Sequence, residues 1–142
     1  MNIAFFLIPK NEIIYLSPES TMRQALEKME FHRYTAVPLL DKEGRYVGTI
    51  TEGDLLWKLK TSESFDFRYT EKIFLKDISL RMKNKPVRIN AEIKDVISLA
   101  IEQNFVPVVD DSDIFIGIVR RREILEHYAS MLEDKILAYE QD

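Results

Sequence analysis

Residues 34–55, YTAVPLLDKEGRYVGTITEGDL, have a second, similar copy at residues 104–124, NFVPVVDDSDIFIGIVRRREI. Each copy contains an apolar run, a polar turn, a second apolar run with a glycine, and the start of a helix. This order is typical of a β-hairpin followed by a helix, and it predicts a fold built from two repeats. The copies align without a gap: Ala36 with Phe105, Pro38 with Pro107, Asp41 with Asp110 and Gly48 with Gly117.

The length of 142 residues suits two interlocked halves that share a core. A lone half of about 60–70 residues would bury too little apolar surface to be stable. We expect a first repeat at 1–60, a connector at 61–72, and a second repeat at 73–142 that ends in an extended helix. The connector carries aromatic residues and lacks the glycine and proline content of a free linker, so we expect it to be packed.

Composition excludes several classes of function. The net charge is -4, with 20 basic and 24 acidic residues interspersed, which argues against nucleic-acid or membrane binding over the whole surface. With no cysteine and 2 histidines, the usual zinc sets and thiolate chemistry are excluded. No catalytic triad, P-loop or GxGxxG motif is present, so we expect neither an enzyme nor a bound metal or cofactor. The apolar run 3–8 ends at Pro9, too short for a signal or spanning helix, and this predicts a cytoplasmic protein.

Apolar periodicity predicts the elements around the two hairpins. In the first repeat these are a helical or extended arm at 3–8, a strand at 13–16, a helix that starts within 17–20 and carries the stripe Met22, Ala25, Leu26 and Met29, and strands at 35–40 and 46–50. In the second repeat they are a strand at 87–89, a helix with Ile93, Val96, Ile97 and Ala100, and strands at 105–110 and 114–119. The final helix, 122–139, has a broad apolar face, which either covers the protein's own core or lies in a dimer interface.

Two prolines stand inside strand patterns. Proline cannot donate to a β-ladder, so the strands at Pro38 and Pro107 should have an unpaired side. The neighbouring backbone could then bind a purine edge, although an ordinary edge strand explains the prolines equally well. The backbone concerned is that of Thr35, Ala36, Val37, Phe105 and Val106.

The helix starts that follow the two hairpins differ. In the first repeat Thr51 and Asp54 form a capping-box pattern, which either only caps the helix or places a phosphate on Thr51 and ribose hydroxyls on Asp54. In the second repeat Arg120, Arg121 and Arg122 crowd positive charge at a helix N-terminus. A bound phosphate would turn that unfavourable arrangement into a favourable one. The alternative is a solvated charge run paired with the acidic turn 110–113.

The doubled pattern aromatic-x-x-V-P-h-h-D followed by h-G-h-h-T-x-x-D-h, where h is apolar, resembles the CBS domain, named after cystathionine β-synthase. The resemblance covers nearly the whole chain and is closest to small stand-alone CBS-pair proteins, some of which bind cyclic-di-AMP. It implies an α/β (α+β) fold of tandem repeats, each β-α-β-β-α, related by a pseudo-twofold axis.

The resemblance also implies two ligand clefts. In the first, Thr51 and Asp54 would face the edge of Phe105 and Val106, with Arg88 nearby. In the second, the three arginines 120–122 would face Ile14, Thr35 and Ala36. Glu123 there replaces the ribose-binding aspartate of the family, and Arg121 matches a position that is basic in the cyclic-di-AMP binders.

We therefore predict a regulatory module that binds an adenine nucleotide, either AMP, ADP, ATP or cyclic-di-AMP, and signals to a partner protein as a homodimer. The alternative is a structural dimerisation unit whose pockets bind nothing.

Overall fold

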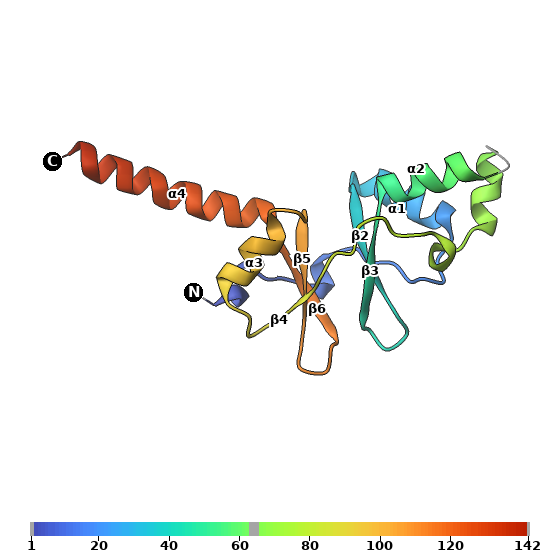
Figure 1. The fold of residues 1–142 in the computed structure, drawn as a ribbon, viewed down its shortest axis with the longest axis horizontal. Helices are drawn as coiled ribbons and strands as arrows, with labels where there is room; N and C mark the ends of the chain where they lie inside the picture. The colour runs from blue at the N-terminus through green and yellow to red at the C-terminus, as the bar shows by residue number, and fades with distance from the viewer. Residues whose placement is uncertain (1, 63–65, 142) are drawn as a thin grey trace.

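A computed structural model describes residues 2–62 and 66–141 of the chain, and it shows two α/β halves side by side (Figure 1). The first half contains α1 (Met22–His32), β2 (Ala36–Leu40), β3 (Tyr46–Thr51) and α2 (Glu52–Thr61). The second contains β4 (Val87–Arg88), α3 (Ile93–Ala100), β5 (Phe105–Val109), β6 (Phe115–Arg120) and α4 (Arg121–Glu140). The predicted fold class, two repeats in a mixed α/β arrangement, is confirmed.

Both predicted hairpins form antiparallel pairs in the same register. Strand β2 pairs with β3 so that Pro38 lies opposite Thr49, and β5 pairs with β6 so that Pro107 lies opposite Ile118. The predicted first strand of repeat one is reduced to an isolated parallel bridge between Leu16 and Leu39, whereas its counterpart β4 pairs with β5. The prediction of a strand at 13–16 was therefore too long.

The halves exchange their N-terminal arms. Strand β1 (Ile8–Pro9) pairs with β6 of the second repeat, and the short helix before it, Ile3–Phe6, packs into that repeat's core. The corresponding arm of the second repeat contains Ile73 and Leu75. Both residues are buried in the core of the first repeat. Gly117 permits this crossing, since a Cβ there would stand 2.2 Å from the carbonyl oxygen of Ile8.

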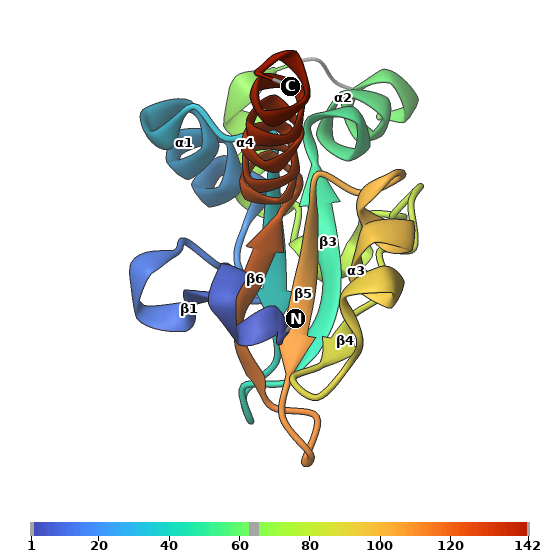
Figure 2. The ribbon, with the colours of Figure 1, turned by 90° about the vertical axis from the view of Figure 1, so that its left-hand side faces the viewer.

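The halves also share a central core, as the sequence predicted. The two hairpins lie against each other at the centre of the molecule (Figure 2), and Leu40 is buried with Phe105, Phe115 and Ile118. The ring of Tyr46 stacks on that of Phe115, its counterpart in the repeat, with centroids 6.4 Å apart.

Helix α1 begins at Met22, later than predicted, because Thr21 is the residue that caps it. The Thr21 hydroxyl accepts from the Gln24 amide and the Gln24 side chain accepts from the Thr21 amide, which completes a capping box. Residues 17–20 form a turn before it. The predicted stripe is confirmed, with Met22, Ala25 and Met29 buried and Leu26 packed against them.

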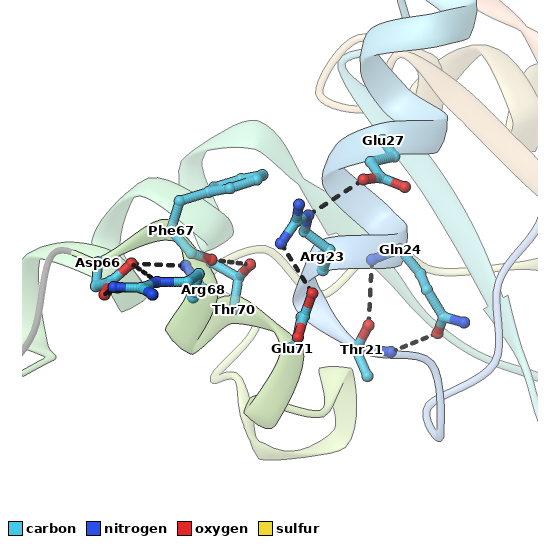
Figure 3. Close-up of polar contacts among 9 residues, drawn as sticks. All are labelled: Thr21, Arg23, Gln24, Glu27, Asp66, Phe67, Arg68, Thr70 and Glu71. Atoms are coloured by element: carbon cyan, nitrogen blue, oxygen red, sulfur yellow. Dashed lines mark hydrogen bonds and ion pairs between the residues drawn. The ribbon is translucent and has the colours of Figure 1, made fainter.

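Residues 66–72 of the connector pack on α1 (Figure 3). Arg23 of α1 bonds to Glu71 at 3.0 Å and to Glu27 at 3.1 Å, while its guanidinium lies 4.0 Å from the centre of the Phe67 ring. The connector here forms a short 3-10 helix, Phe67–Lys72. Residues 63–65 lie outside the described residues.

Helix α4 extends away from the body of the molecule (Figure 1). Only Ile124 on it is buried, and its apolar residues further along are exposed, from Leu125 at 61% to Tyr139 at 86%. Most of the apolar face thus does not cover the protein's own core. No helix of the described part of the chain has the length and apolar character needed to cross a membrane.

Candidate functional site

A hollow of about 510 Å³ lies between the two repeats at the start of α4. It is lined by the beginning of β2, the end of β6, the first turn of α4 and the segment after β1. The lining residues include three that the sequence assigned to the second cleft, Ile14, Thr35 and Ala36, together with Arg120. We call this hollow the open cleft.

The walls of the open cleft are largely apolar. Ile13, Ile14, Pro38, Phe105 and Ile118 line it, and Tyr34 adds an aromatic ring that stacks on His32 with centroids 5.3 Å apart. A flat apolar heterocycle fits such walls.

One strand edge offers backbone to the open cleft. The carbonyl of Pro38 accepts from Leu16 at 3.0 Å, so Pro38 is turned away from β3. Because backbone groups alternate along a strand, Ala36 faces the same side, and Val37 faces β3. Ala36 therefore lines the open cleft, and the binding of a ligand by its backbone stays a prediction. Val37, contrary to expectation, offers no backbone to the cleft, and its side chain is fully buried.

The three arginines at the start of α4 have three different environments. Arg120 lines the open cleft and pairs with Glu123, its Nε donating at 3.0 Å. Arg122 points elsewhere and pairs with Glu126, whose carboxylate raises the pKa of Arg122. Only Arg120 lines the predicted cleft, and none of the three pairs with the acidic turn 110–113.

Arg121 stabilises the end of α3. Its guanidinium donates to the carbonyls of Ala100 and Ile101, the latter at 3.2 Å, and to the Asn104 side chain at 3.3 Å. These carbonyls belong to the last turn of a helix, where a cation is favourable. The structure therefore does not bring Arg121 into the cleft, contrary to the expected arrangement.

The first predicted cleft is closed. Asp54 is only 2% exposed, and its carboxylate accepts from the Thr51 amide and hydroxyl, both at 2.9 Å. The same carboxylate also accepts from the Arg81 amide at 2.9 Å. Asp54 thus caps α2 and holds the segment that precedes β4, so its oxygens do not face a free hollow.

Residues 80–85, which we call the closing segment, are tied down at several points beside Asp54. The Tyr46 hydroxyl contacts Thr49 at 2.6 Å and donates to the Asn84 carbonyl at 3.1 Å, and burial raises the pKa of Tyr46 to about 12. The Gln103 side chain, 5% exposed, bonds to both the amide and the carbonyl of Lys85.

Other residues assigned to the first cleft also lie elsewhere or are occupied. Arg88 pairs with Asp113 in the β5–β6 turn at 3.2 Å, so its guanidinium is engaged there. The Phe105 carbonyl already accepts from Gln103 at 3.2 Å. Val106 is fully buried, and by strand alternation its backbone faces β6. These predictions placed the residues correctly in strands, but Phe105 lines the open cleft and not the first cleft, and Arg88 and Val106 do not line the open cleft.

Sequence reasoning missed several residues that line the open cleft, among them Glu12, Arg33, Tyr34 and Asn104. Arg33 ends α1 in the left-handed conformation, with φ 62° and ψ 35°, where glycine is the usual residue. That unusual choice was a possible signal, but helix ends are poorly located from sequence. No group of three or more histidine, aspartate or glutamate side chains in residues 2–62 and 66–141 is arranged to hold a metal.

Comparison with known families identifies a domain that matches both repeats. The model of the CBS domain matches residues 7–61 and again residues 75–130. Together these ranges cover most of the chain and coincide with the two halves of the structure.

Individual relatives are more distant. The chain is 26% identical over 121 residues to the cyclic di-AMP receptor B of Bacillus subtilis, covering 85% of this chain and 82% of that protein. It is 27% identical over 126 residues to inosine-5'-monophosphate dehydrogenase of Methanocaldococcus jannaschii, covering 87% of this chain but only 24% of the enzyme. In fold it resembles the Listeria monocytogenes CbpB protein crystallised with c-di-AMP, with a TM-score of 0.79, 20% identity, and 92% and 97% of the two chains covered.

Proposed function

The chain belongs to the CBS domain family, and on that premise we propose that it is a regulatory module that binds an adenine nucleotide in the open cleft and signals to a partner protein. The observation that carries the proposal is the cleft itself. It combines apolar walls, the backbone of Ala36 and the charged pair Arg120–Glu123 in one hollow of about 510 Å³.

Each part of an adenine nucleotide finds a suitable group in that cleft. The base fits between the apolar walls, and its edge, which carries both donors and acceptors, suits the Ala36 backbone. The ribose hydroxyls can donate to Glu123, which occupies the position of Asp54 in the other repeat. The volume also falls within the range of roughly 300–1,000 Å³ that is usual for ligand pockets.

The closed first cleft leads us to propose one nucleotide site in each chain. Binding there would require Asp54 to release both Thr51 and Arg81. The likeness to cyclic di-AMP receptor B and to the CbpB protein crystallised with c-di-AMP supports this dinucleotide as the first ligand to test, alongside AMP, ADP and ATP.

We further propose a homodimer. The exposed apolar residues of α4 support it, as does a groove of about 540 Å³ between α1 and α2 that is lined by Leu26, Leu55, Leu56 and Leu59. Sedimentation should show a particle of twice the chain mass of 16.7 kDa. A particle of single mass at micromolar concentration would contradict the dimer.

Thermal unfolding with a nucleotide panel tests the binding proposal. A ligand at 100 times its Kd adds about 2.7 kcal/mol to the free energy of unfolding, which raises Tm by roughly 5–10 °C in a chain of this size. Thr35→Trp, which fills the exposed side of the open cleft, should abolish the shift, and Ser98→Trp on the exposed face of α3 should preserve it. If no adenine nucleotide shifts Tm, the structural dimerisation module is the better description.

A further inference from the structure

The open cleft is lined by four charged side chains: Glu12, Arg33, Arg120 and Glu123. Arg120 and Glu123 neutralise each other in an ion pair. Within residues 2–62 and 66–141, Arg33 forms no ion pair and no side-chain hydrogen bond. Of the cleft's two guanidinium groups, Arg33 is therefore the one not already engaged by a carboxylate.

The backbone holds Arg33 in place while its side chain stays unpaired. Its amide donates to the carbonyls of Glu30 and Met29, which fixes the residue at the end of α1. The next residue, Tyr34, donates its amide to Met29 at 3.0 Å and lines the same cleft. The root of the Arg33 side chain thus lies at a defined point on the rim.

Charge balance gives Arg33 a specific role. Without it, the charged lining would consist of two carboxylates and one guanidinium, which would repel a phosphate. With Arg33 the lining is neutral before any ligand arrives. A guanidinium binds phosphate oxygens through two parallel N–H bonds, so an unpaired arginine at the rim is a suitable phosphate partner.

We propose that Arg33 is the phosphate-binding residue of the open cleft, in the role that the sequence assigned to Arg121. This inference rests on the proposed function, because it names the residue that recognises the charged part of the nucleotide. Arg33 would thereby set the preference of the cleft for phosphorylated ligands over nucleosides.

Arg33→Gly is a suitable test, because glycine adopts the left-handed conformation readily and α1 should end as before. Arg33 also lines the groove between α1 and α2, so sedimentation should first show that the variant keeps the particle mass of the wild type. The probes are AMP, cyclic-di-AMP and adenosine, measured by calorimetry. We expect AMP and cyclic-di-AMP to bind about 10–100-fold more weakly to the variant, as when a charge-assisted bond is lost, with adenosine changed by less than about 3-fold. Arg33→Lys, which keeps the charge without the fork, should lose less than Arg33→Gly.

Arg68→Ala serves as the matched control, since it removes one exposed arginine from the connector, away from the lining of the cleft. It should leave all three affinities unchanged. If Arg33→Gly binds AMP and cyclic-di-AMP as the wild type does, the role of Arg33 is overturned and the nucleotide function stands. An equal loss for adenosine would also overturn it, because Arg33 would then shape the cleft. If the wild type binds none of the three probes, and neither ADP nor ATP shifts its Tm, the proposed function fails, and the inference fails with it.

Discussion

Helices α2 and α4 begin at equivalent points of the two repeats, yet their first turns are built differently. At α2 the capping box of Thr51 and Asp54 is complete, and Asp54 is buried. At α4 the residue in the Thr51 position is Arg120, no side chain caps the helix, and Glu123 pairs with Arg120 at the edge of a hollow.

The contrast shows how one repeat can be committed to stability and the other left available for a ligand. Asp54 satisfies its own helix and the closing segment at once, so freeing it would expose buried donors. The side chains of Glu123 and Arg120 are partly exposed, at 28% and 48%. Breaking their ion pair to bind a ligand therefore costs little free energy.

The largest effect is expected for Asp54→Ala. The change leaves the Thr51 and Arg81 amides, both bonded to the carboxylate, without that acceptor in a partly buried place. We expect a loss of about 3 kcal/mol in the free energy of unfolding, measured by urea denaturation. Nucleotide affinity should be unchanged, because the open cleft does not use Asp54.

Unchanged stability with weakened nucleotide binding in Asp54→Ala would contradict the distinction between a closed cleft at α2 and an open cleft at α4. If the variant unfolds at the same urea concentration as the wild type but binds ribonucleotides much more weakly than 2′,3′-dideoxy analogues, then Asp54 binds ribose and the first cleft is a ligand site. Asp54→Asn is the matched control, since it keeps the size of the side chain but loses the charge.

A smaller loss is expected for Arg121→Ala. From sequence alone, removal of a cation from a helix N-terminus should leave stability unchanged or raise it slightly. The structure reverses that expectation, because Arg121 bonds to carbonyls at the end of α3. We expect a loss of about 2 kcal/mol. Arg122→Ala, which breaks only an exposed pair with Glu126, should cost less than about 0.5 kcal/mol. Equal effects of the two changes would show that the α3 contact contributes nothing.

These corrections show what the sequence could and could not predict. The hairpins, the stripe of α1 and the shared core follow from local patterns and chain length, which a single sequence contains. The bond from Asp54 to Arg81 joins residues 27 apart, and that from Arg121 to Ile101 joins residues 20 apart across different elements. No local pattern encodes such contacts. The open cleft was located because the resemblance supplied the pairing of Ile14, Thr35 and Ala36 with the start of α4.

An intermediate effect is expected for Tyr46→Phe, which tests how the closing segment is held. Phe115 occupies the equivalent position in the other repeat and has no hydroxyl. Loss of the bonds to Thr49 and Asn84 should cost about 1 kcal/mol near neutral pH.

The pH dependence of the same variant gives an independent check. Because burial raises the pKa of Tyr46 from 10.0 to about 12, the neutral phenol stabilises the folded state fully below pH 10. That contribution is lost as pH rises from 10 to about 12. Between pH 9 and pH 11 the wild type should therefore lose about 1 kcal/mol more than Tyr46→Phe. Parallel pH profiles for the two proteins would mean that the hydroxyl is not buried.

The smallest change in stability is expected for Glu123→Ala, and this variant sharpens the comparison most directly. Its pair with Arg120 is partly exposed, so unfolding should change by less than about 1 kcal/mol. Binding should change in two opposite ways. Removing a carboxylate and releasing Arg120 should strengthen the binding of inorganic phosphate and of AMP's phosphate group, whereas adenosine should bind more weakly because its ribose loses an acceptor.

Two measurements separate the role of Glu123 as a ribose acceptor from its role as the charge partner of Arg120. Calorimetry with adenosine and with 2′,3′-dideoxyadenosine reports the ribose acceptor, because only the first can lose bonds to the carboxylate. Stronger AMP binding together with unchanged adenosine binding would leave Glu123 as a charge partner of Arg120 alone. If Glu123→Ala instead destabilises the protein as much as Asp54→Ala, the first turns of α2 and α4 are equivalent in function, and the distinction between a closed and an open cleft fails.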